Sequence, residues 1–405
     1  MNTAHPNKAR MPVYLDHAAT TPVDTRVALA MADVLRSETG YGNPASTSHD
    51  YGDAAAALVE SARAQVAAAV GARAAEVIWT SGATEASNLA IFGVSQYYRD
   101  RGRHIVTART EHKAVLDPCR ELERRGWEVS YLLPDKEGLL DPGQVAAALR
   151  PDTVLVSLMH VNNEIGVVQN IAAVAAICAR HGGAWLHVDA AQSVGKCPVD
   201  FASLGADLMS LSAHKVYGPK GVGALLVAQR GEAARGRVQL AALQFGGGQE
   251  RSLRAGTLPT HQIVGMGLAL ELASRLSSME TARVAQLQQR LWRGLAAIGG
   301  VLRNGSATRS VPHLLNVSFE GVEGESLLAA IRPYVAVSTG SACTSALAEP
   351  SYVLRALGRS ERLSESSLRF GLGRTTTEGD IDTAVTVLTR EVGRLRNVAG
   401  AMPVA

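Results

Sequence analysis

Aromatic side chains, long apolar runs and paired cysteines are all scarce in this chain of 405 residues. Aromatic residues make up 4% of it, too few for the base-stacking surfaces of proteins that bind single-stranded nucleic acid. Charged residues interrupt even the alanine-rich segment 53–70, so no run approaches the roughly 20 apolar residues of a membrane-spanning helix. No CxxC pair occurs, which argues against a zinc site or a disulfide framework; the cysteines are Cys119, Cys178, Cys197 and Cys343.

Charge is nearly balanced, with 40 Lys and Arg against 37 Asp and Glu, a net charge of +3. Because these residues are spread along the chain, we expect neither a nucleic-acid partner nor a membrane surface. Residues 1–12 lack the apolar core of a secretory signal, which favours a soluble, cytoplasmic protein. A hydrophobic content of 46% and the length of the chain predict two domains with sizeable cores.

Short β-branched runs alternate with amphipathic segments from residue 77 onward, a pattern typical of α/β proteins. It predicts a large domain, residues 13–260, with a mainly parallel seven-stranded sheet flanked by helices on both faces. The expected strands are 77–80, 104–108, 128–133, 153–159, 184–189, 207–211 and 222–227, and the expected helices are 85–98, 113–125, 143–149 and 171–180.

After Gly256 the regular alternation of strand-like and helix-like segments changes, which predicts a smaller α/β domain of residues 261–405. Residues 1–12 are expected to belong to this smaller domain. A long helix is expected over 261–297. The other expected elements are strands at 314–319, 334–337 and 367–370 and helices at 325–332, 351–357 and 378–394.

Three segments hold residue types suited to a phosphorylated cofactor. In 80–85 (TSGATE) a strand ends and a helix begins, so free backbone N–H groups favour a phosphate, although Thr84 is equally explained as a helix cap. Asp189 ends a strand, where open α/β sheets bind ligands, or is a simple turn residue. Lys215 lies in the loop 213–221 and would form a Schiff base if partly desolvated; alone, it would be an ordinary surface lysine.

Together the phosphate cradle, the strand-end acid and the loop lysine predict pyridoxal phosphate, which needs partners for its phosphate, ring nitrogen and aldehyde. No Walker A loop is present, and residues 40–45 (GYGNPA) match a dinucleotide motif without the strand it requires. Cys343 lies among small hydroxylated residues in the loop 338–349, a setting that favours a reactive thiol over a buried filler. The remaining cysteines are expected to be unreactive.

The sequence resembles the cysteine desulfurases, class V enzymes of fold-type I that use pyridoxal phosphate, and within them the Isc-type branch of iron–sulfur cluster assembly. The resemblance covers residues 14 to 395. It rests on an ordered series of motifs: GNPAS (42–46), TSGATE (80–85), TEHKAV (110–115), HVNNEIG (160–166), HVDAAQ (187–192), HKVYGPKG (214–221), RAGTLP (254–259), SACTSA (341–346), EPSYVLRALG (349–358) and RFGLGR (369–374).

This resemblance implies conversion of L-cysteine to L-alanine, with the sulfur carried as a persulfide on Cys343 and no resident metal beyond a transient iron–sulfur ligand role for Cys343. Lys215 would bind the cofactor aldehyde, and His112 would stack on the ring and shuttle protons. Arg369, with Asn163, would bind the substrate. The implied cofactor contacts are Ala83, Thr84, Ser212 and His214 to the phosphate, Thr257 to the phosphate of the other subunit, and Asn163, Asp189 and Gln192 to the ring.

The Thr257 role implies a homodimer, and the branch implies an iron–sulfur scaffold protein and other sulfur acceptors, including carriers for tRNA thiolation, as partners. Two departures stand out: Ala213 replaces a usual glycine, and the chain lacks the longer, aromatic-containing tail that docks the scaffold. Selenocysteine lyase and class V aminotransferase are the alternatives on the same fold, and the latter has no need of Cys343. A non-catalytic scaffold would not require Lys215 and Cys343, yet both are present.

Overall fold

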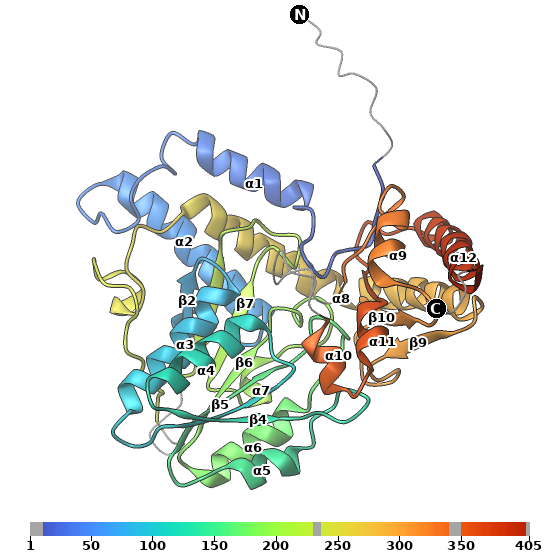
Figure 1. Cartoon of the computed structure of the whole chain (residues 1–405). Coiled ribbons are helices and arrows are strands. Elements are labelled where there is room, and N and C mark those ends of the chain that lie inside the picture. The colour runs from blue at the N-terminus through green and yellow to red at the C-terminus, as the bar shows by residue number, and fades with distance from the viewer. Residues whose placement is uncertain (1–10, 230–235, 340–349, 402–405) are drawn as a thin grey trace, which may run out of the picture. The chain divides into compact units, whose positions relative to one another are not determined.

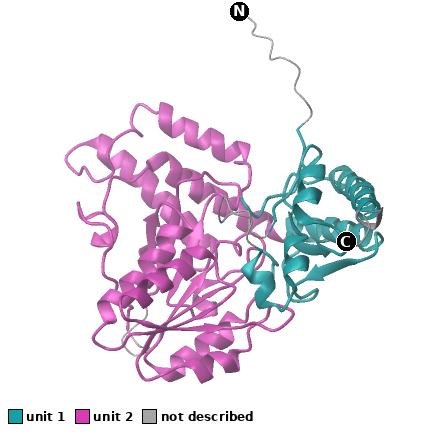
Figure 2. Ribbon diagram, in the orientation of Figure 1, with its two compact units in different colours: residues 1–19, 164–166, 279–405 teal, residues 20–163, 167–278 magenta. Residues whose placement is uncertain are grey.

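The structure is a computed structural model that describes residues 11–229, 236–339 and 350–401 (Figure 1). It contains two compact units, one of residues 20–163 and 167–278 and one of residues 1–19, 164–166 and 279–405 (Figure 2). Most of the cysteine loop predicted at 338–349, including Cys343, lies outside the described residues. The domain limits predicted from the sequence, 13–260 and 261–405, stay predictions.

A seven-stranded sheet forms the centre of the larger unit, in the order β2-β8-β7-β6-β5-β3-β4. All neighbours pair in parallel except β8, which runs antiparallel to both β2 and β7. The mainly parallel sheet expected from the sequence is therefore confirmed. Its strands are β2 (Val77–Thr80), β3 (His104–Ala108), β4 (Glu128–Leu132), β5 (Thr153–Met159), β6 (Trp185–Asp189), β7 (Leu208–Ser212) and β8 (Gly223–Val227).

Helices cover both faces of this sheet because successive strand residues point to opposite sides. Ile78 packs into the core under α3 (Ala83–Tyr98) and α4 (Lys113–Arg124), whereas its neighbours Val77 and Trp79 belong to the opposite core. That second core is built with α2 (Asp50–Ala69), α5 (Pro142–Ala148), α6 (Ile171–His181), α7 (Phe201–Leu204) and the first half of α8 (Thr260–Ala296). Cys119 and Cys178 are buried in these cores, one on each face.

In the smaller unit, an antiparallel sheet of order β12-β10-β9 packs against helices, and a two-stranded parallel pair joins β1 to β11. The short strand β9, four residues without a clear alternation, was not expected from the sequence. The strands are β1 (Val13–Tyr14), β9 (Val301–Asn304), β10 (Leu314–Phe319), β11 (Val335–Ala336) and β12 (Ser367–Gly371), and the helices are α9 (Gly324–Ile331), α10 (Tyr352–Ala356), α11 (Glu361–Glu365) and α12 (Glu378–Ala401).

The N-terminal helix α1 (Thr25–Arg36) buries a single residue, Val27, against Ala269 and Leu272 of α8. Among the helices of the described chain, none combines the length and the apolar character that crossing a bilayer requires.

Gly393 offers a direct test of helix propensity in α12. A methyl group added there would meet no atom within 4 Å, and glycine inside a helix costs about 0.5–1 kcal/mol relative to alanine. We expect Gly393→Ala to raise the free energy of unfolding by about that amount in denaturant titrations. Gly294→Ala is the control, because its methyl would lie 2.6 Å from Val385, and it should destabilise the protein. Equal effects of the two changes would contradict this account.

Candidate active site

The strand register brings two of the predicted cofactor segments to one edge of the sheet. Thr80, the last residue of β2, is paired with Gly223, and Gly223 is in turn paired with Ser212, the last residue of β7. The turn into α3 and the segment leading to Lys215 therefore start at the same edge of the sheet, on either side of Gly223 in β8. Alone, each segment had a plain structural explanation; their adjacency favours a common ligand.

Backbone contact at Gly223 fixes this arrangement. A Cβ atom at this position would lie 2.5 Å from the carbonyl oxygen of Leu211 and 2.6 Å from the Cα of Gly82, distances that no side chain tolerates. Gly82 itself adopts a φ of 156°, and a Cβ there would meet nothing within 4 Å. The turn thus packs against β8 at its back and is open in front of the first turn of α3.

Hydrogen-bond donors of the kind that a phosphate requires are available at this edge of the sheet. The first N–H groups of α3, around Ala83 and Thr84, have no helical carbonyl to bind and attract an anion. The buried Ser212 hydroxyl has no hydrogen-bond partner in the part of the chain that the structure describes, and such an orphaned group suits an additional ligand. The donor set therefore fits the phosphate of pyridoxal phosphate.

His214, the residue before Lys215, is held from the N-terminal side. Its Nδ1 lies 3.1 Å from the hydroxyl of Thr20, and its carbonyl accepts a 2.9 Å hydrogen bond from Thr21. Burial, followed by the positive charge of Lys215, lowers the pKa of the His214 ring to about 4. His214 is therefore neutral near pH 7 when no anion is bound beside it.

Asp189 ends β6, opposite Met159 of β5 and Ser210 of β7. It is 7% exposed, and its Oδ1 accepts a 2.9 Å hydrogen bond from the N–H of Ala191. A carboxylate at this buried edge matches the partner that a protonated ring nitrogen needs. Its place next to Ser210 agrees with the ring-binding role predicted for it.

A buried chain of polar side chains runs across the strands behind Asp189. Ser157 Oγ lies 2.8 Å from Nδ1 of His187, Nε2 of His187 lies 2.8 Å from Oγ of Ser210, and Ser87 donates to Ser210 at 3.1 Å. Burial lowers the pKa of His187 to about 4, so the ring stays neutral. The sequence interpretation missed this series of hydrogen-bonded side chains. The only sign of it in the sequence is that otherwise apolar strands carry polar residues at matching positions.

His112 caps α4, with its Nδ1 accepting a 3.1 Å hydrogen bond from the N–H of Ala114. A neutral ring that accepts at Nδ1 carries its proton on Nε2. Thr84 and His112 line one hollow of about 370 Å³, so the structure brings these two predicted residues together.

Glu111, the residue before His112, was also missed by the sequence interpretation. One of its oxygens accepts a 3.0 Å hydrogen bond from the N–H of Met159, which ties the loop before α4 to the end of β5. Burial, reinforced by the negative charge of Asp189, raises the pKa of the Glu111 carboxyl well above its usual range. This shift favours the protonated carboxyl, and the hydrogen bond from Met159 holds the start of α4.

Two further predicted ring contacts, Asn163 and Gln192, are buried in the same unit. The side-chain oxygen of Gln192 accepts from the ammonium group of Lys196, which is itself 7% exposed. Thr257 is exposed in the loop before α8, and its predicted contact with another subunit stays a prediction.

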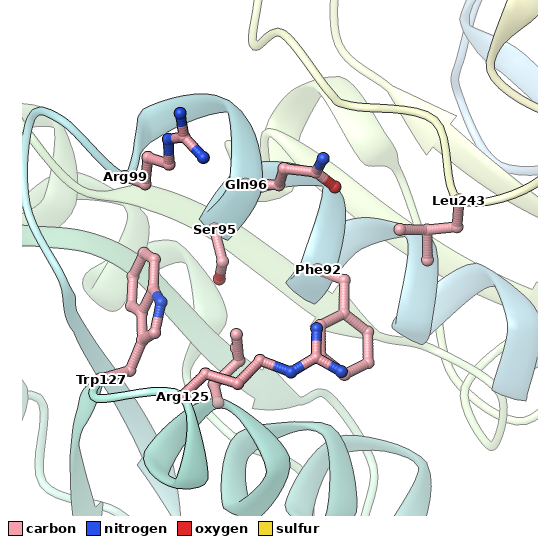
Figure 3. A pocket seen from close by; sticks show the side chains of 8 residues that line it. Phe92, Ser95, Gln96, Arg99, Arg125, Trp127 and Leu243 are labelled. Carbon is pink, nitrogen blue, oxygen red and sulfur yellow. The ribbon is translucent and has the colours of Figure 1, made fainter.

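A second hollow, of about 440 Å³, contains none of the predicted site residues (Figure 3). Its lining includes the apolar side chains of Leu122 and Trp127, and the Arg125 guanidinium lies 5.4 Å from the centroid of the Phe92 ring. It is lined by Phe92, Ser95, Gln96, Arg99, Leu122, Arg125, Trp127 and Leu243.

Arg369, the predicted substrate-binding residue, belongs to β12 of the smaller unit. It is 2% exposed, and its Nη2 lies 3.0 Å from Oδ1 of Asp16. Its backbone N–H donates to the carbonyl of Ser338 at 2.7 Å. Arg369 is thus fixed next to the residue that begins the predicted cysteine loop.

The loop's other side is anchored through Glu164. Ser351, the N-cap of α10, donates a 2.5 Å hydrogen bond to Oε2 of Glu164. Complete burial raises the pKa of Glu164 to about 7, against the lowering effects of this hydrogen bond and of Arg369. Glu164 therefore titrates near neutral pH inside the protein.

Comparison with known proteins decides the family. The family described as aminotransferase class-V matches residues 13–384. The chain belongs to this family. Pyridoxal phosphate is the family's cofactor, which confirms the cofactor expected from the three segments.

The same similarity extends to curated proteins over nearly their whole length. The cysteine desulfurases IscS of Pectobacterium atrosepticum and Photorhabdus laumondii are each 53% identical over 390 residues, covering 96% of this chain and 95% of theirs. A solved structure described as a NifS-like protein superimposes with a TM-score of 0.87 at 34% identity, over 95% of this chain and all of that one. DndA from Streptomyces lividans gives a TM-score of 0.75 at 43% identity, over 89% and 99% of the two chains.

Replacing Gly223 should damage the cradle. We expect Gly223→Ala to lower stability by about 1–3 kcal/mol, the usual range for overpacking, and to weaken cofactor binding because its methyl displaces the Gly82 turn. Titration of the apoprotein with pyridoxal phosphate, followed by absorbance, measures the second effect. Gly393→Ala, with open space for its methyl, is the control, and unchanged cofactor affinity in Gly223→Ala would refute the proposed packing.

Glu164 predicts a pH-dependent stability. Between its usual pKa of 4.5 and its folded pKa of about 7, the folded chain holds a proton that the unfolded chain releases, so stability falls as pH rises through this window. We expect Glu164→Gln to melt higher than wild type at about pH 8 and to lose most of that advantage at about pH 5. The exposed Glu325→Gln is the control. A melting-point difference independent of pH would contradict the buried, protonated carboxyl.

Proposed function

We propose that this chain is a pyridoxal-phosphate-dependent cysteine desulfurase, which converts L-cysteine to L-alanine and receives the sulfur on Cys343. The main support is 53% identity with cysteine desulfurases over nearly the whole of both chains. The convergence of Thr84, Asp189, Ser212 and Lys215 on one edge of the sheet agrees with it.

The cofactor, when bound, supplies an electron sink for the carbon from which the substrate loses a proton. Its phosphate would be held by Ala83, Thr84, Ser212 and His214, its ring nitrogen by Asp189 and its aldehyde by Lys215. The carboxylate of Asp189 would hold the ring nitrogen in its protonated form, which would strengthen this electron sink.

Lys215 and His112 would each carry out a different proton transfer of the reaction. The Nζ of Lys215, when it is not bound to the aldehyde, would act as the base that accepts the α-proton of cysteine. His112 offers its Nε2 to the substrate side, because Nδ1 accepts the N–H of Ala114. We assign to that Nε2 the proton exchange with the substrate thiol. Arg369, a planar fork, would bind the substrate carboxylate.

Sulfur transfer requires a thiolate at Cys343. Its attack on the substrate sulfur forms an S–S bond and breaks the C–S bond, and the electron pair from that bond, with a proton, completes alanine. The enzyme keeps the sulfur as a persulfide, which a thiol reductant releases as sulfide. The net reaction consumes one cysteine and one enzyme thiol and yields alanine and the persulfide.

The assembly and the acceptors follow from the resemblance and from the exposure of Thr257. We propose a homodimer in which Thr257 of each subunit contacts the cofactor phosphate of the other subunit. We also propose that the protein is cytoplasmic. The persulfide would supply an iron–sulfur scaffold protein and, as a second acceptor, the tRNA thiolation carriers.

Cys343→Ser tests this function. We expect wild type to release alanine and sulfide in equal amounts from L-cysteine with a thiol reductant, and Cys343→Ser to lose at least about a hundredfold in both while keeping its yellow cofactor. Cys197→Ser is the matched control, because burial raises the pKa of the Cys197 thiol to about 12 and leaves it unreactive. Full activity of Cys343→Ser would exclude the persulfide route and turn attention to a lyase or aminotransferase reaction.

A further inference from the structure

The segment before Thr257 has a strained backbone. In the 3-10 turn Gln249–Ser252, three consecutive residues that are not glycine, Glu250, Arg251 and Ser252, have φ values of 45°, 59° and 63°. Such left-handed conformations cost of order 1–3 kcal/mol each and persist only where surrounding contacts impose them. Something must therefore hold this turn in place.

A buried ion pair supplies the constraint. Nη1 and Nη2 of Arg63, in α2, lie 2.9 and 2.8 Å from the two carboxylate oxygens of Glu250. The side chains are 7% and 3% exposed. Paired forks of this kind fix direction as well as distance. Glu250 is thus oriented, and the turn that carries it is oriented with it.

The same ion pair caps the edge of the sheet. β2 is the terminal strand of the seven-stranded order. Glu250 accepts a 2.7 Å hydrogen bond from the N–H of Trp79, and Arg63 donates at 2.9 Å to the carbonyl of Val77. These hydrogen bonds fix the position of the turn relative to β2, the strand that ends at Thr80, where the proposed phosphate site begins.

A second anchor lies closer to Thr257. Arg254 donates to Glu85 at 2.9 Å, and Glu85 accepts the N–H of Ser81 at 2.6 Å, at the start of α3. The N–H of Gly256 donates to the side chain of Gln249 at 3.1 Å. The chain is thus fixed at the turn and after it, up to the residue before Thr257, and the side chain of Thr257 itself is exposed.

We propose that the Arg63–Glu250 ion pair positions Thr257 for the partner subunit, and so sets the affinity of the neighbouring active site for the cofactor phosphate. This inference rests on the homodimer and the Thr257 contact proposed above. Arg63 and Glu250 are positioning residues: each acts through the turn. A hydroxyl bound to a phosphate must be placed within a fraction of an ångström, which a freely moving loop does not achieve.

Equilibrium binding of pyridoxal phosphate to the apoprotein tests the inference. We expect Thr257→Ala and Glu250→Gln each to raise the dissociation constant about tenfold, the effect of losing one charge-assisted hydrogen bond. The double variant Glu250→Gln/Thr257→Ala should bind no more weakly than Thr257→Ala alone, because the ion pair acts only through Thr257. Additive losses would overturn the inference.

The matched control is Glu60→Gln. Glu60 contacts the same guanidinium at 3.0 Å, but its side chain is 63% exposed, and an exposed ion pair contributes little. We expect wild-type cofactor affinity in this variant. An equal loss in Glu60→Gln would assign the effect to the charge of Arg63 in general and overturn the role of the turn.

Folding is separated from positioning by a second variant. Arg63→Lys keeps the buried charge but loses the bidentate fork, so it should remain folded by circular dichroism and still bind the cofactor more weakly. Trypsin should also cleave it faster after the exposed Arg251. Unchanged affinity in both Arg63→Lys and Glu250→Gln, with weakened binding in Thr257→Ala, would refute this inference alone. Unchanged affinity in Thr257→Ala would refute the contact between subunits as well, and alanine release by wild type tests the desulfurase function separately.

Discussion

The close backbone contact between Gly223 and Gly82 is the constraint on which the proposed cofactor site depends. It sets the position of β8 between the end of β2 and the end of β7, and the parallel register of the next strands then places Asp189 relative to Ser212. The backbone hydrogen bonds of one sheet therefore set the positions of the turn at residues 80–85, of Asp189 and of the segment leading to Lys215. The side chains supply the functional groups, whereas the backbone determines where these groups lie.

Burial shifts the pKa values of several ionisable groups around this edge of the sheet toward their neutral forms. His187, His214 and His160 have pKa values lowered to about 4, and that of Glu111 is raised well above its usual range. The polar chain from Ser157 to Ser87 is satisfied by neutral hydrogen bonds. In such a low-dielectric setting, a charged group such as the proposed ring partner Asp189 interacts more strongly with a ligand than it would in water.

The sequence predicted the strands, the sheet type and the cofactor, because buried parallel strands are continuous apolar runs and the site motifs follow them directly. It did not predict the antiparallel direction of β8, since strand direction leaves no trace in composition. Nor could it show that Arg63 meets Glu250 or that Ser87 meets Ser210, because such pairs join residues far apart in the chain. Short strand β9, without a repeating pattern, gave no signal at all. Asp189 and Lys215 could be predicted as site residues because each lies at or just after the end of a strand, and their roles stay predictions.

The placement of β2 has a consequence for how the chain is made. Its neighbour in the sheet is β8, the last of the seven strands in chain order. A nascent polypeptide emerging from the ribosome therefore carries β2 without a strand to pair with until residues 223–227 have been synthesised. During that interval its hydrophobic residues, Val77, Ile78 and Trp79, have no neighbouring strand. An unpaired strand edge of this kind can pair with another chain and promote aggregation. Completion of the phosphate cradle is thus among the late events in the biogenesis of this unit.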